Sequence, residues 1–277
     1  MTDLVRYELR GPAAHITLNR PDKLNAISSA MVDGLESALA SATADGEVKL
    51  VVLRGEGRAF CSGYDLTDES GGPTTTGDQW HRELSRDVEV TMQLWRLAKP
   101  TIAAVQGWCL GGGCELAMAC DIVVASEDAH FGEPEIRFGS GPATLLMPHV
   151  IGLKRAGLLL LTGDVIDADR AERFGLVSRV VPGAELETAV AELIARIAPT
   201  PLATLRYTKL ALLRAADAMG LSQAVAANLD LSAILNADDS PEQREFDEIA
   251  SRDGLKAALR WRDSRYGDLA AGGQSTP

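Results

Sequence analysis

The stretch Gln106-Gly-Trp-Cys-Leu-Gly-Gly-Gly-Cys-Glu-Leu-Ala-Met-Ala-Cys-Asp121 decides the fold of this chain. The apolar run before it, residues 101–106, predicts a short buried strand, and residues 113–120 predict an apolar helix. Residues 111–113 therefore form a strand-to-helix turn made of glycine alone. Such a turn lets a ligand approach the backbone closely, because it has no Cβ atoms, and the first N–H groups of the helix have no partner within it.

Free N–H donors with the helix dipole behind them suit an anion, or an oxygen that gains negative charge during a reaction. A plain packing turn, with Glu115 capping the helix, is the alternative at this point. Glycine-rich turns of this kind also bind nucleotide phosphates. The chain has neither a Gly-x-Gly-x-x-Gly nor a Gly-Lys-Ser/Thr pattern, so neither a dinucleotide site nor a P-loop is expected.

A second passage supplies a matching donor. Residues 49–54 are rich in β-branched side chains and predict a strand, which Gly55-Glu-Gly-Arg-Ala-Phe-Cys-Ser-Gly-Tyr-Asp-Leu66 follows. The sharpest point of this loop is Gly63. The next backbone N–H, that of Tyr64, could aim at the same point as the N–H of Gly112. Two convergent donors of this kind form an oxyanion hole.

Two glutamates, Glu115 and Glu135, lie in segments that otherwise predict buried apolar structure. Burying a carboxylate without a partner is costly, so a fold that keeps two of them is expected to use them. Glu115 follows the three glycines, and Glu135 closes Phe131-Gly-Glu-Pro-Glu135. For Glu135 the alternative is that Glu-Pro-Glu caps a surface loop.

Five ordered motifs give the chain a resemblance to a known family. They are Asn19-Arg-Pro-Asp-Lys-Leu-Asn-Ala-Ile27, Ala59-Phe-Cys-Ser-Gly-Tyr-Asp-Leu66, residues 107–121, residues 131–135 and Leu161-Thr-Gly-Asp164. Over residues 5–266 the chain resembles the crotonase superfamily, and most closely its enoyl-CoA hydratases. The resemblance implies an α/β fold, a spiral of ββα turns with a C-terminal all-helical oligomerisation region. No internal sequence repeat indicates the spiral by itself.

The resemblance also implies roles by position. The backbone N–H groups of Tyr64 and Gly112 hold the thioester oxygen of an acyl-CoA, and Glu115 and Glu135 hold the water. The implied substrate-binding residues are Lys23, Leu24, Ala26, Ala59, Gly63, Asp65, Leu66, Trp108, Gly111 and Pro134. No cofactor and no metal are implied, because coenzyme A is part of the substrate. A homotrimer, or a hexamer built as a dimer of trimers, is implied.

The implied reaction adds water to a trans-2-enoyl-CoA and gives a 3-hydroxyacyl-CoA. The two N–H groups stabilise the enolate, Glu115 takes a proton from water, and Glu135 delivers one to C2. These two tasks require the carboxyl pKa values to be pushed apart. The alternatives are a Δ3,Δ2-enoyl-CoA isomerase, which manages with one carboxylate, and a thioester hydrolase or C–C lyase. The retained pair argues against a non-enzymatic binding protein.

Two departures from the hydratases leave the acyl specificity open. Tyr64 stands where Ala is common, which affects the size of the pocket but not the backbone donor. Residues 136–148 are shorter than the corresponding wall of many relatives. Arg137 could face a polar acyl group or lie on the surface, and the surface position is favoured.

Composition agrees with a soluble enzyme. A chain of 277 residues that is 46% hydrophobic can bury a substantial core, and a net charge of −12 disfavours nucleic acid as a partner. No apolar run reaches the length of a membrane span, and the N-terminus has no signal-peptide pattern. The cysteines are expected to be reduced packing residues of a cytoplasmic protein, and the histidines form no metal-ligand cluster. These residues are Cys61, Cys109, Cys114 and Cys120, and His15, His81, His130 and His149.

The pattern changes at Pro199-Thr-Pro201, which predicts a core of residues 1–199 with the active site, a helical region of residues 200–266 and a disordered tail of residues 267–277. The core is expected to alternate strands and helices, with a mobile loop at residues 67–79. The remaining predicted strands are residues 5–9, 13–18, 121–125 and 176–181. The remaining predicted helices are residues 28–43, 79–97, 167–174, 186–197, 202–216, 221–236 and 241–262. Apolar side chains expected to pack between subunits are Leu205, Leu212, Leu221, Val225 and Leu229.

Overall fold

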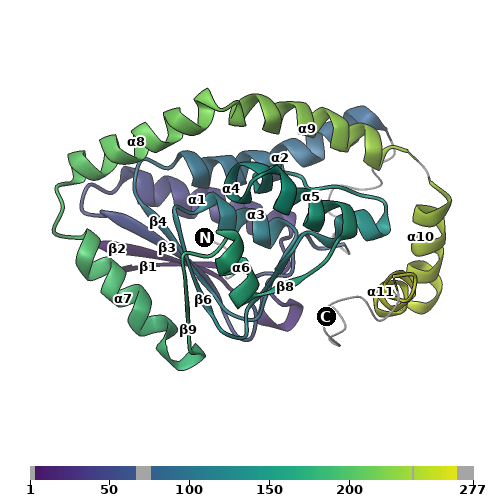
Figure 1. Ribbon diagram of the computed structural model, residues 1–277, viewed down its shortest axis with the longest axis horizontal. Helices are drawn as coiled ribbons and strands as arrows, with labels where there is room; N and C mark the ends of the chain where they lie inside the picture. The colour runs from purple at the N-terminus through teal and green to yellow at the C-terminus, as the bar shows by residue number, and fades with distance from the viewer. Residues whose placement is uncertain (1–3, 67–75, 239, 267–277) are drawn as a thin grey trace.

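The computed structural model describes residues 4–66, 76–238 and 240–266, which form two sheets surrounded by helices (Figure 1). The six-stranded sheet has the order β1-β2-β3-β4-β6-β9, and the three-stranded sheet has the order β5-β7-β8. The predicted loop at residues 67–79 falls mainly, and the predicted tail wholly, outside the described residues. The expected fold class is confirmed, an α/β fold with a run of C-terminal helices.

The large sheet begins with an antiparallel pair and continues in parallel. Its strands are β1 (Val5–Arg10), β2 (Ala13–Leu18), β3 (Leu50–Gly55), β4 (Thr101–Val105), β6 (Ile122–Ser126) and β9 (Arg179–Val181). Alternate side chains of β3 enter two cores: Leu50 and Val52 pack with α7 (Leu186–Ile197), whereas Val51 and Leu53 pack on the side of α1 (Ser29–Ala44). Because helices cover both faces of this sheet, the side chains on both faces are buried, and the strand sequences are therefore continuous apolar runs.

Two of the three strands of the small sheet, β5 and β7, directly follow strands of the large sheet. Its members are β5 (Trp108–Leu110), β7 (His130–Gly132) and β8 (Ile166–Asp167), and Cys61 adds a bridge to Cys109. The chain thus runs β4-β5-α3 (Gly112–Ala119) and then β6-β7-η2 (Pro134–Phe138). Each turn places one strand in the large sheet, one in the small sheet, and then a helix. This repetition is the ββα spiral that the family resemblance implied.

Side-chain caps fix the starts of several helices, and two of these starts agree with the sequence prediction. Ser28 caps α1, and Asp167 caps α6 (Ala168–Phe174). α2 (Gly77–Arg96) begins earlier than predicted, because Thr76 and Gln79 form a capping box. The remaining helices before the C-terminal region are η1 (Pro21–Lys23), α4 (Met147–Ile151), α5 (Leu153–Thr162) and η3 (Gly183–Glu185).

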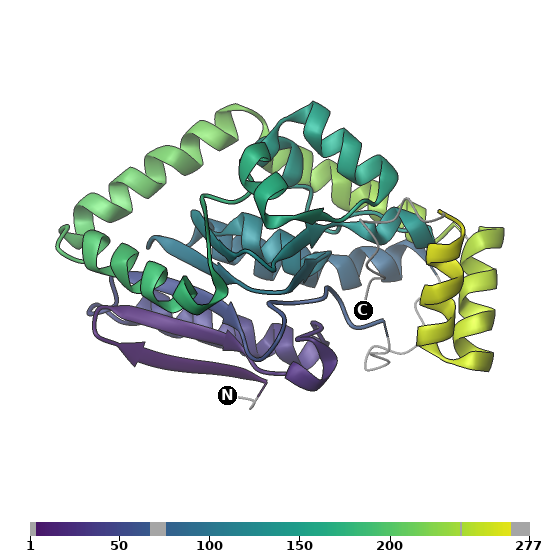
Figure 2. The same cartoon turned by 60° about the horizontal axis from the view of Figure 1, so that its bottom comes forward.

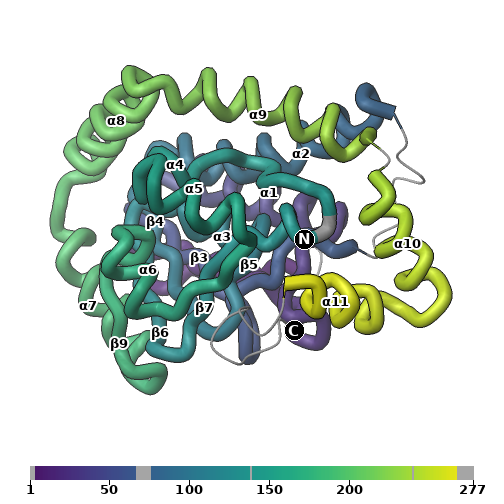
Figure 3. Tube along the Cα trace, turned by 45° about the vertical axis from the view of Figure 1, so that its right-hand side comes forward, coloured from purple at the N-terminus to yellow at the C-terminus, as the bar shows by residue number. Residues whose placement is uncertain are grey.

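The C-terminal region consists of α8 (Leu202–Ala218), α9 (Leu221–Asn236), α10 (Pro241–Asp253) and α11 (Leu255–Ser264). The prediction of one helix over residues 241–262 was wrong. Gly254, with φ of +86°, ends α10 and turns the chain into α11. α8 and α9 run along the outside of the molecule, and α10 and α11 lie as a pair at one end (Figures 2 and 3).

Buried contacts fasten these helices to the core. Lys209 of α8 is buried, its Nζ lies 2.9 Å from Oδ2 of Asp121, and it donates to the carbonyl oxygen of Lys99. Leu221 and Val225 pack into the chain's own core, so the prediction that they form a subunit contact is not supported. The large apolar side chains that α8, α9 and their connection leave exposed are Tyr207, Leu210, Leu212, Met219, Leu231, Ile234 and Leu235.

Two features bear on the environment of the chain. All four cysteines are free and buried, as expected of packing residues. Within the described ranges, no single helix is long and apolar enough to cross a membrane; α8 and α9 meet that criterion only as a pair with a 58° bend between them.

Candidate active site

The glycine turn between β5 and α3 is fixed by close backbone contacts. Gly111 has φ of +50°, a conformation that suits glycine, and its N–H donates to the carbonyl oxygen of Gly132 at 2.9 Å. A Cβ on Gly112 would lie 2.4 Å from a ring carbon of Tyr64, and one on Gly113 would lie 2.5 Å from the carbonyl oxygen of Cys61. The turn therefore has room for glycine only.

The second predicted loop meets this turn. A Cβ on Gly63, whose φ is +101°, would lie 3.7 Å from the backbone nitrogen of Gly112. Ile27 holds the loop in place by donating to the Gly63 carbonyl oxygen and by forming a bridge with Tyr64. Among the described residues, neither the Tyr64 N–H nor the Gly112 N–H donates a hydrogen bond. The structure thus brings the two proposed oxyanion donors together.

Glu115 is buried on α3, with an exposed fraction of 1%. Its Oε1 accepts a 2.6 Å hydrogen bond from the Thr144 N–H, and its Oε2 lies 3.4 Å from the Tyr64 hydroxyl. No side chain caps α3, so the capping alternative does not hold. Burial raises the pKa of Glu115 to about 8, although the Thr144 N–H opposes this shift, and the nearby Glu135 raises the pKa further.

Glu135 lies on η2 and reaches the same glycine turn. Its Oε1 occupies the space beside Gly111, where a Cβ would come within 2.1 Å of it. Its Oε2 is buried and has no hydrogen-bond partner among the described residues. Burial raises the pKa of Glu135 to about 7, while the Arg262 guanidinium lowers it. Glu115 and Glu135 therefore lie at the same glycine turn, and the charge of each raises the pKa of a neighbouring carboxyl group.

A third glutamate, Glu133, was not predicted as a site residue. It directly follows β7, its exposed fraction is 2%, and neither carboxyl oxygen has a hydrogen-bond partner within the described part of the chain. Burial raises its pKa well above the usual range, and the charges of Cys114, Glu115 and Glu135 add to this shift. No side chain caps η2, so Glu-Pro-Glu is not a loop cap. The sequence feature that could have identified Glu133 is its position as an acidic residue immediately after a buried strand.

Asp87 of α2 is a fourth acidic group near the site that was missed. Burial raises its pKa to about 7, and the neighbouring Glu83 adds to the shift. Its charge raises the pKa of both Tyr64 and Glu115, so it lies close enough to influence them. The only signal in the sequence was an aspartate among the apolar positions of an amphipathic helix.

Several implied substrate-binding residues surround the loop of Gly63. The Leu24 carbonyl oxygen accepts from Ser62, and the Ala26 N–H donates to the carbonyl oxygen of Lys23, which is exposed. Ala59 is buried, and its carbonyl oxygen accepts from the side chain of Asn25. Asn25 thereby ties the segment from Lys23 to Ala26 to the loop that carries Gly63.

The other implied binding residues differ in their surroundings. Asp65 accepts a 2.6 Å bond from Arg20, and this ion pair anchors the loop. Leu66 is exposed, Pro134 is buried at the first position of η2, and the ring of Trp108 lies against that of His130 with centroids 5.0 Å apart. The structure thus gives Asp65 and Trp108 partners within the chain, and these partners already account for their positions.

The prediction that Arg137 lies on the surface was wrong. Its exposed fraction is 5%, its Nη2 lies 2.8 Å from Oδ1 of Asp164, and its Nε donates to the carbonyl oxygen of Thr162. Gly163, with φ of +66°, leaves room for the side chain of Arg137. These contacts explain the motif Leu161-Thr-Gly-Asp164. Through Arg137, the motif holds η2, and with it Glu135, against the end of α5.

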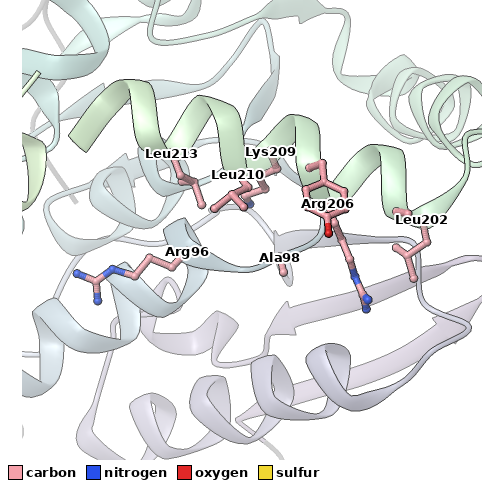
Figure 4. Close-up of a pocket in the computed structure, with 9 residues that line it drawn as sticks. Arg96, Ala98, Leu202, Arg206, Lys209, Leu210 and Leu213 are labelled. Atoms are coloured by element: carbon pink, nitrogen blue, oxygen red, sulfur yellow. The ribbon is translucent and has the colours of Figure 1, made fainter. Parts of the chain in front are cut away.

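Two hollows lie outside the turn itself. The larger, of about 530 Å³, lies between α8 and the end of α2 (Figure 4) and includes none of the candidate site residues. The smaller, of about 290 Å³, is lined by Glu133, by the wall that follows Glu135, and by Leu160 and Leu235. The smaller hollow therefore adjoins the candidate site through Glu133.

Comparisons with known proteins agree with this geometry. The family model described as enoyl-CoA hydratase/isomerase matches residues 10–248. A probable mitochondrial enoyl-CoA hydratase of Dictyostelium discoideum is 38% identical over 205 residues, which cover 73% of this chain and 72% of that protein. A short-chain-enoyl-CoA hydratase of Clostridium acetobutylicum is 36% identical over 214 residues, with 76% and 81% covered.

Solved structures give the same result. An enoyl-CoA hydratase/isomerase from Xanthobacter autotrophicus Py2 superposes with a TM-score of 0.92 at 41% identity, covering 95% of this chain and 98% of that one. An enoyl-CoA hydratase from Mycobacterium smegmatis has a TM-score of 0.88 at 30% identity, with 96% and 94% covered. The chain belongs to the enoyl-CoA hydratase/isomerase family, and its fold is the crotonase fold.

Proposed function

We propose that this chain is an enoyl-CoA hydratase, which adds water to the double bond of a trans-2-enoyl-CoA and produces a 3-hydroxyacyl-CoA. The observation that carries the proposal is the meeting of Glu115 and Glu135 at the glycine turn, where the unused backbone N–H of Gly112 lies close to the loop that carries the unused N–H of Tyr64. The names of the relatives support the same reaction, because several are described as hydratases.

The two backbone donors serve the charge that develops on the substrate. As water attacks C3, electron density moves through C2 onto the thioester oxygen. The N–H groups of Tyr64 and Gly112 stabilise this oxygen more strongly in the enolate than in the substrate, because its negative charge grows. Their positions are held by the backbone contacts of Gly63 and Gly111, so the donors need no rearrangement during the reaction.

The two glutamates move the protons. Burial raises the pKa of both carboxyl groups, to about 8 for Glu115 and about 7 for Glu135, so each can exchange a proton near neutral pH. One carboxylate is then ready to take a proton from water while the other delivers a proton to C2. In this proposal both groups are required.

A panel of thioesters tests the proposed reaction. Purified protein is mixed with trans-2-enoyl-CoA thioesters of increasing chain length, and the loss of the conjugated absorbance is followed. We expect a loss with at least one of them and formation of the 3-hydroxyacyl product. A protein that converts a 3-enoyl-CoA to its conjugated isomer without adding water would be an isomerase, and one that leaves every thioester unchanged would not be a hydratase.

We also propose that the protein assembles as a trimer or as a hexamer of two trimers. The support is an exposed apolar strip on α8, α9 and their connection, which includes Leu212, Met219, Leu231 and Ile234. An apolar strip of this kind is typical of a face that another protein chain covers. Light scattering at micromolar concentration measures the mass, and a monomeric mass would contradict this assembly.

A further inference from the structure

The cavity of about 290 Å³ lies next to the reacting groups but is not lined by them. Its wall is apolar where Ile136, Pro142, Leu160 and Leu235 contribute, and Glu133 lines it as well. Neither Glu115 nor Glu135 borders the cavity, but the lining residues Glu133 and Ile136 lie on either side of Glu135 in the chain. The cavity therefore begins beside the pair that would handle C2 and C3, where the rest of an acyl chain must go.

Glu133 is the unsatisfied polar group of this wall. The hydroxyl of Ser140, the other polar side chain that lines the cavity, lies 2.9 Å from Oδ1 of Asn236 and is paired with it. Both carboxyl oxygens of Glu133 lack a hydrogen-bond partner among the described residues. An apolar side chain at this position would avoid the cost of burying an unpaired carboxyl group. A ligand that supplies the missing hydrogen-bond partner would give this carboxyl group a role in binding.

The chemistry of that partner follows from the surroundings of Glu133. Two neighbouring glutamates and complete burial favour its protonated form. A neutral carboxyl group donates one hydrogen bond and accepts others, so it pairs well with a hydroxyl or a carbonyl oxygen. A carboxylate on the ligand would instead be repelled by Glu115 and Glu135.

We propose that Glu133 recognises a hydroxyl or oxo group on the outer part of a short acyl chain bound in this cavity. The inference rests on the proposed function only in taking an acyl-CoA as the ligand. The volume is at the lower end of the range of about 300–1,000 Å³ for small-molecule sites, which restricts the chain to a short one. Glu133 would thus determine specificity and take no part in the proton transfers.

Binding of unreactive thioesters tests this role without any turnover. Saturated hexanoyl-CoA is compared by calorimetry with 5-hydroxyhexanoyl-CoA, 6-hydroxyhexanoyl-CoA and 5-oxohexanoyl-CoA. We expect the best oxygenated ligand to bind about five- to ten-fold more tightly than hexanoyl-CoA, the usual range for one hydrogen bond to a buried group. Glu133→Leu should abolish this preference, and Glu133→Gln, which still donates and accepts, should keep part of it.

Controls separate the possible outcomes. Ser140→Ala alters the same wall but leaves Glu133, so it should keep the preference. If Glu133→Leu does not fold, Glu133→Met replaces it as the apolar variant. The proposal is overturned if the wild type binds no oxygenated chain more tightly than hexanoyl-CoA, if an apolar variant keeps the preference, or if 6-aminohexanoyl-CoA binds best.

The same experiment distinguishes this inference from the proposed function. A protein that prefers the oxygenated ligands but hydrates no enoyl-CoA would retain Glu133 as a recognition residue and lose the hydratase assignment. A protein that hydrates crotonyl-CoA and binds hexanoyl-CoA as tightly as its oxygenated analogues would be a hydratase in which Glu133 does not read the acyl chain.

Discussion

The candidate site has a backbone half and a carboxyl half, and the two are built differently. The backbone half consists of Gly63 and the turn at residues 111–113, where main-chain atoms of neighbouring strands touch and no group titrates. The carboxyl half consists of Glu115, Glu133 and Glu135, all with raised pKa values. In the proposed reaction, the first half would position the substrate oxygen, and the second would supply and accept protons.

Replacing either of the two glutamates proposed as catalytic tests the carboxyl half with the largest expected effect. Glu115→Gln and Glu135→Gln should each lower hydration of crotonyl-CoA on the order of 10²-fold or more, because a positioned acid or base is lost. Binding of a saturated acyl-CoA should persist, since the backbone half is unchanged. Steady-state rates and calorimetry measure the two effects. A variant that keeps full activity would remove that glutamate from the mechanism.

A methyl group on Gly112 tests the backbone half. In Gly112→Ala the new Cβ would meet the ring of Tyr64 at 2.4 Å, so the ring, or the loop that carries the proposed Tyr64 donor, must shift. We expect hydration to fall by roughly ten-fold, as one oxyanion donor is partly displaced. Adding Tyr64→Ala removes the ring and should restore most of the activity, a coupling that a double-mutant cycle measures.

The matched control for this test is Gly157→Ala in α5. A Cβ on Gly157 would meet nothing within 4 Å, so the variant should keep its activity. If Gly112→Ala were as active as Gly157→Ala, the backbone half would be more tolerant than its contacts indicate. If Tyr64→Ala gave no rescue, the damage would not come from the ring.

The pH dependence of stability tests the carboxyl half without an assay of turnover. The pKa of Glu115 is raised from 4.5 to about 8 in the folded protein, so the folded state binds more protons than the unfolded state between these values. Its contribution to the free energy of unfolding is present at low pH and declines as pH rises through this window, by up to about 1.4 kcal/mol per pH unit. Glu115→Gln should therefore gain stability relative to the wild type as pH rises.

Urea unfolding at several pH values between 5 and 8.5 measures this difference. Glu47→Gln is a suitable control, because Glu47 is exposed on the surface. A difference between wild type and Glu115→Gln that does not change with pH would mean that Glu115 titrates as an ordinary carboxyl group.

The smallest expected effect concerns the Tyr64 hydroxyl, which lies where the two halves meet. Its oxygen is 3.4 Å from Oε2 of Glu115, longer than a normal O–H···O hydrogen bond. Tyr64→Phe keeps the backbone donor, so it should retain most of the turnover. Because the lost contact is weak, its rate should lie within about three-fold of the wild-type rate. A folded Tyr64→Phe enzyme that binds acyl-CoA but is inactive would show that the hydroxyl takes part in the chemistry.

The backbone half was predictable from the sequence because glycine is informative. Gly63 and Gly111 both have positive φ, and the motifs around them indicated sharp turns. The small sheet was missed, since strands of two or three residues, such as β8, show no period. The break at Gly254 was missed because a glycine within an otherwise helical pattern is often tolerated.

The carboxyl half was only partly predictable, because burial depends on contacts that lie far away in the sequence. Arg137 is charged and resembles a surface residue until its partner Asp164 is known. Glu133 begins a Glu-Pro-Glu sequence that is typical of a loop cap, and only the fold around it shows that its side chain is buried. Glu115 and Glu135 were singled out as acidic residues in otherwise apolar segments, and the resemblance to a known family supplied the spatial relation that local sequence lacks.

The ion pair between buried Lys209 and Asp121 has a consequence for the order in which the chain folds on the ribosome. Asp121 already binds Thr101 through its Oδ2, at 2.7 Å from the Thr101 nitrogen, so the two strands can register as soon as both have emerged. The ammonium group that neutralises this carboxylate comes from α8, 110 positions after the carbonyl of Lys99 that it also binds. N-terminal parts of a chain generally fold first during synthesis. Asp121 therefore gains its Lys209 partner only after α8 has been translated, which makes the docking of α8 a late step of folding.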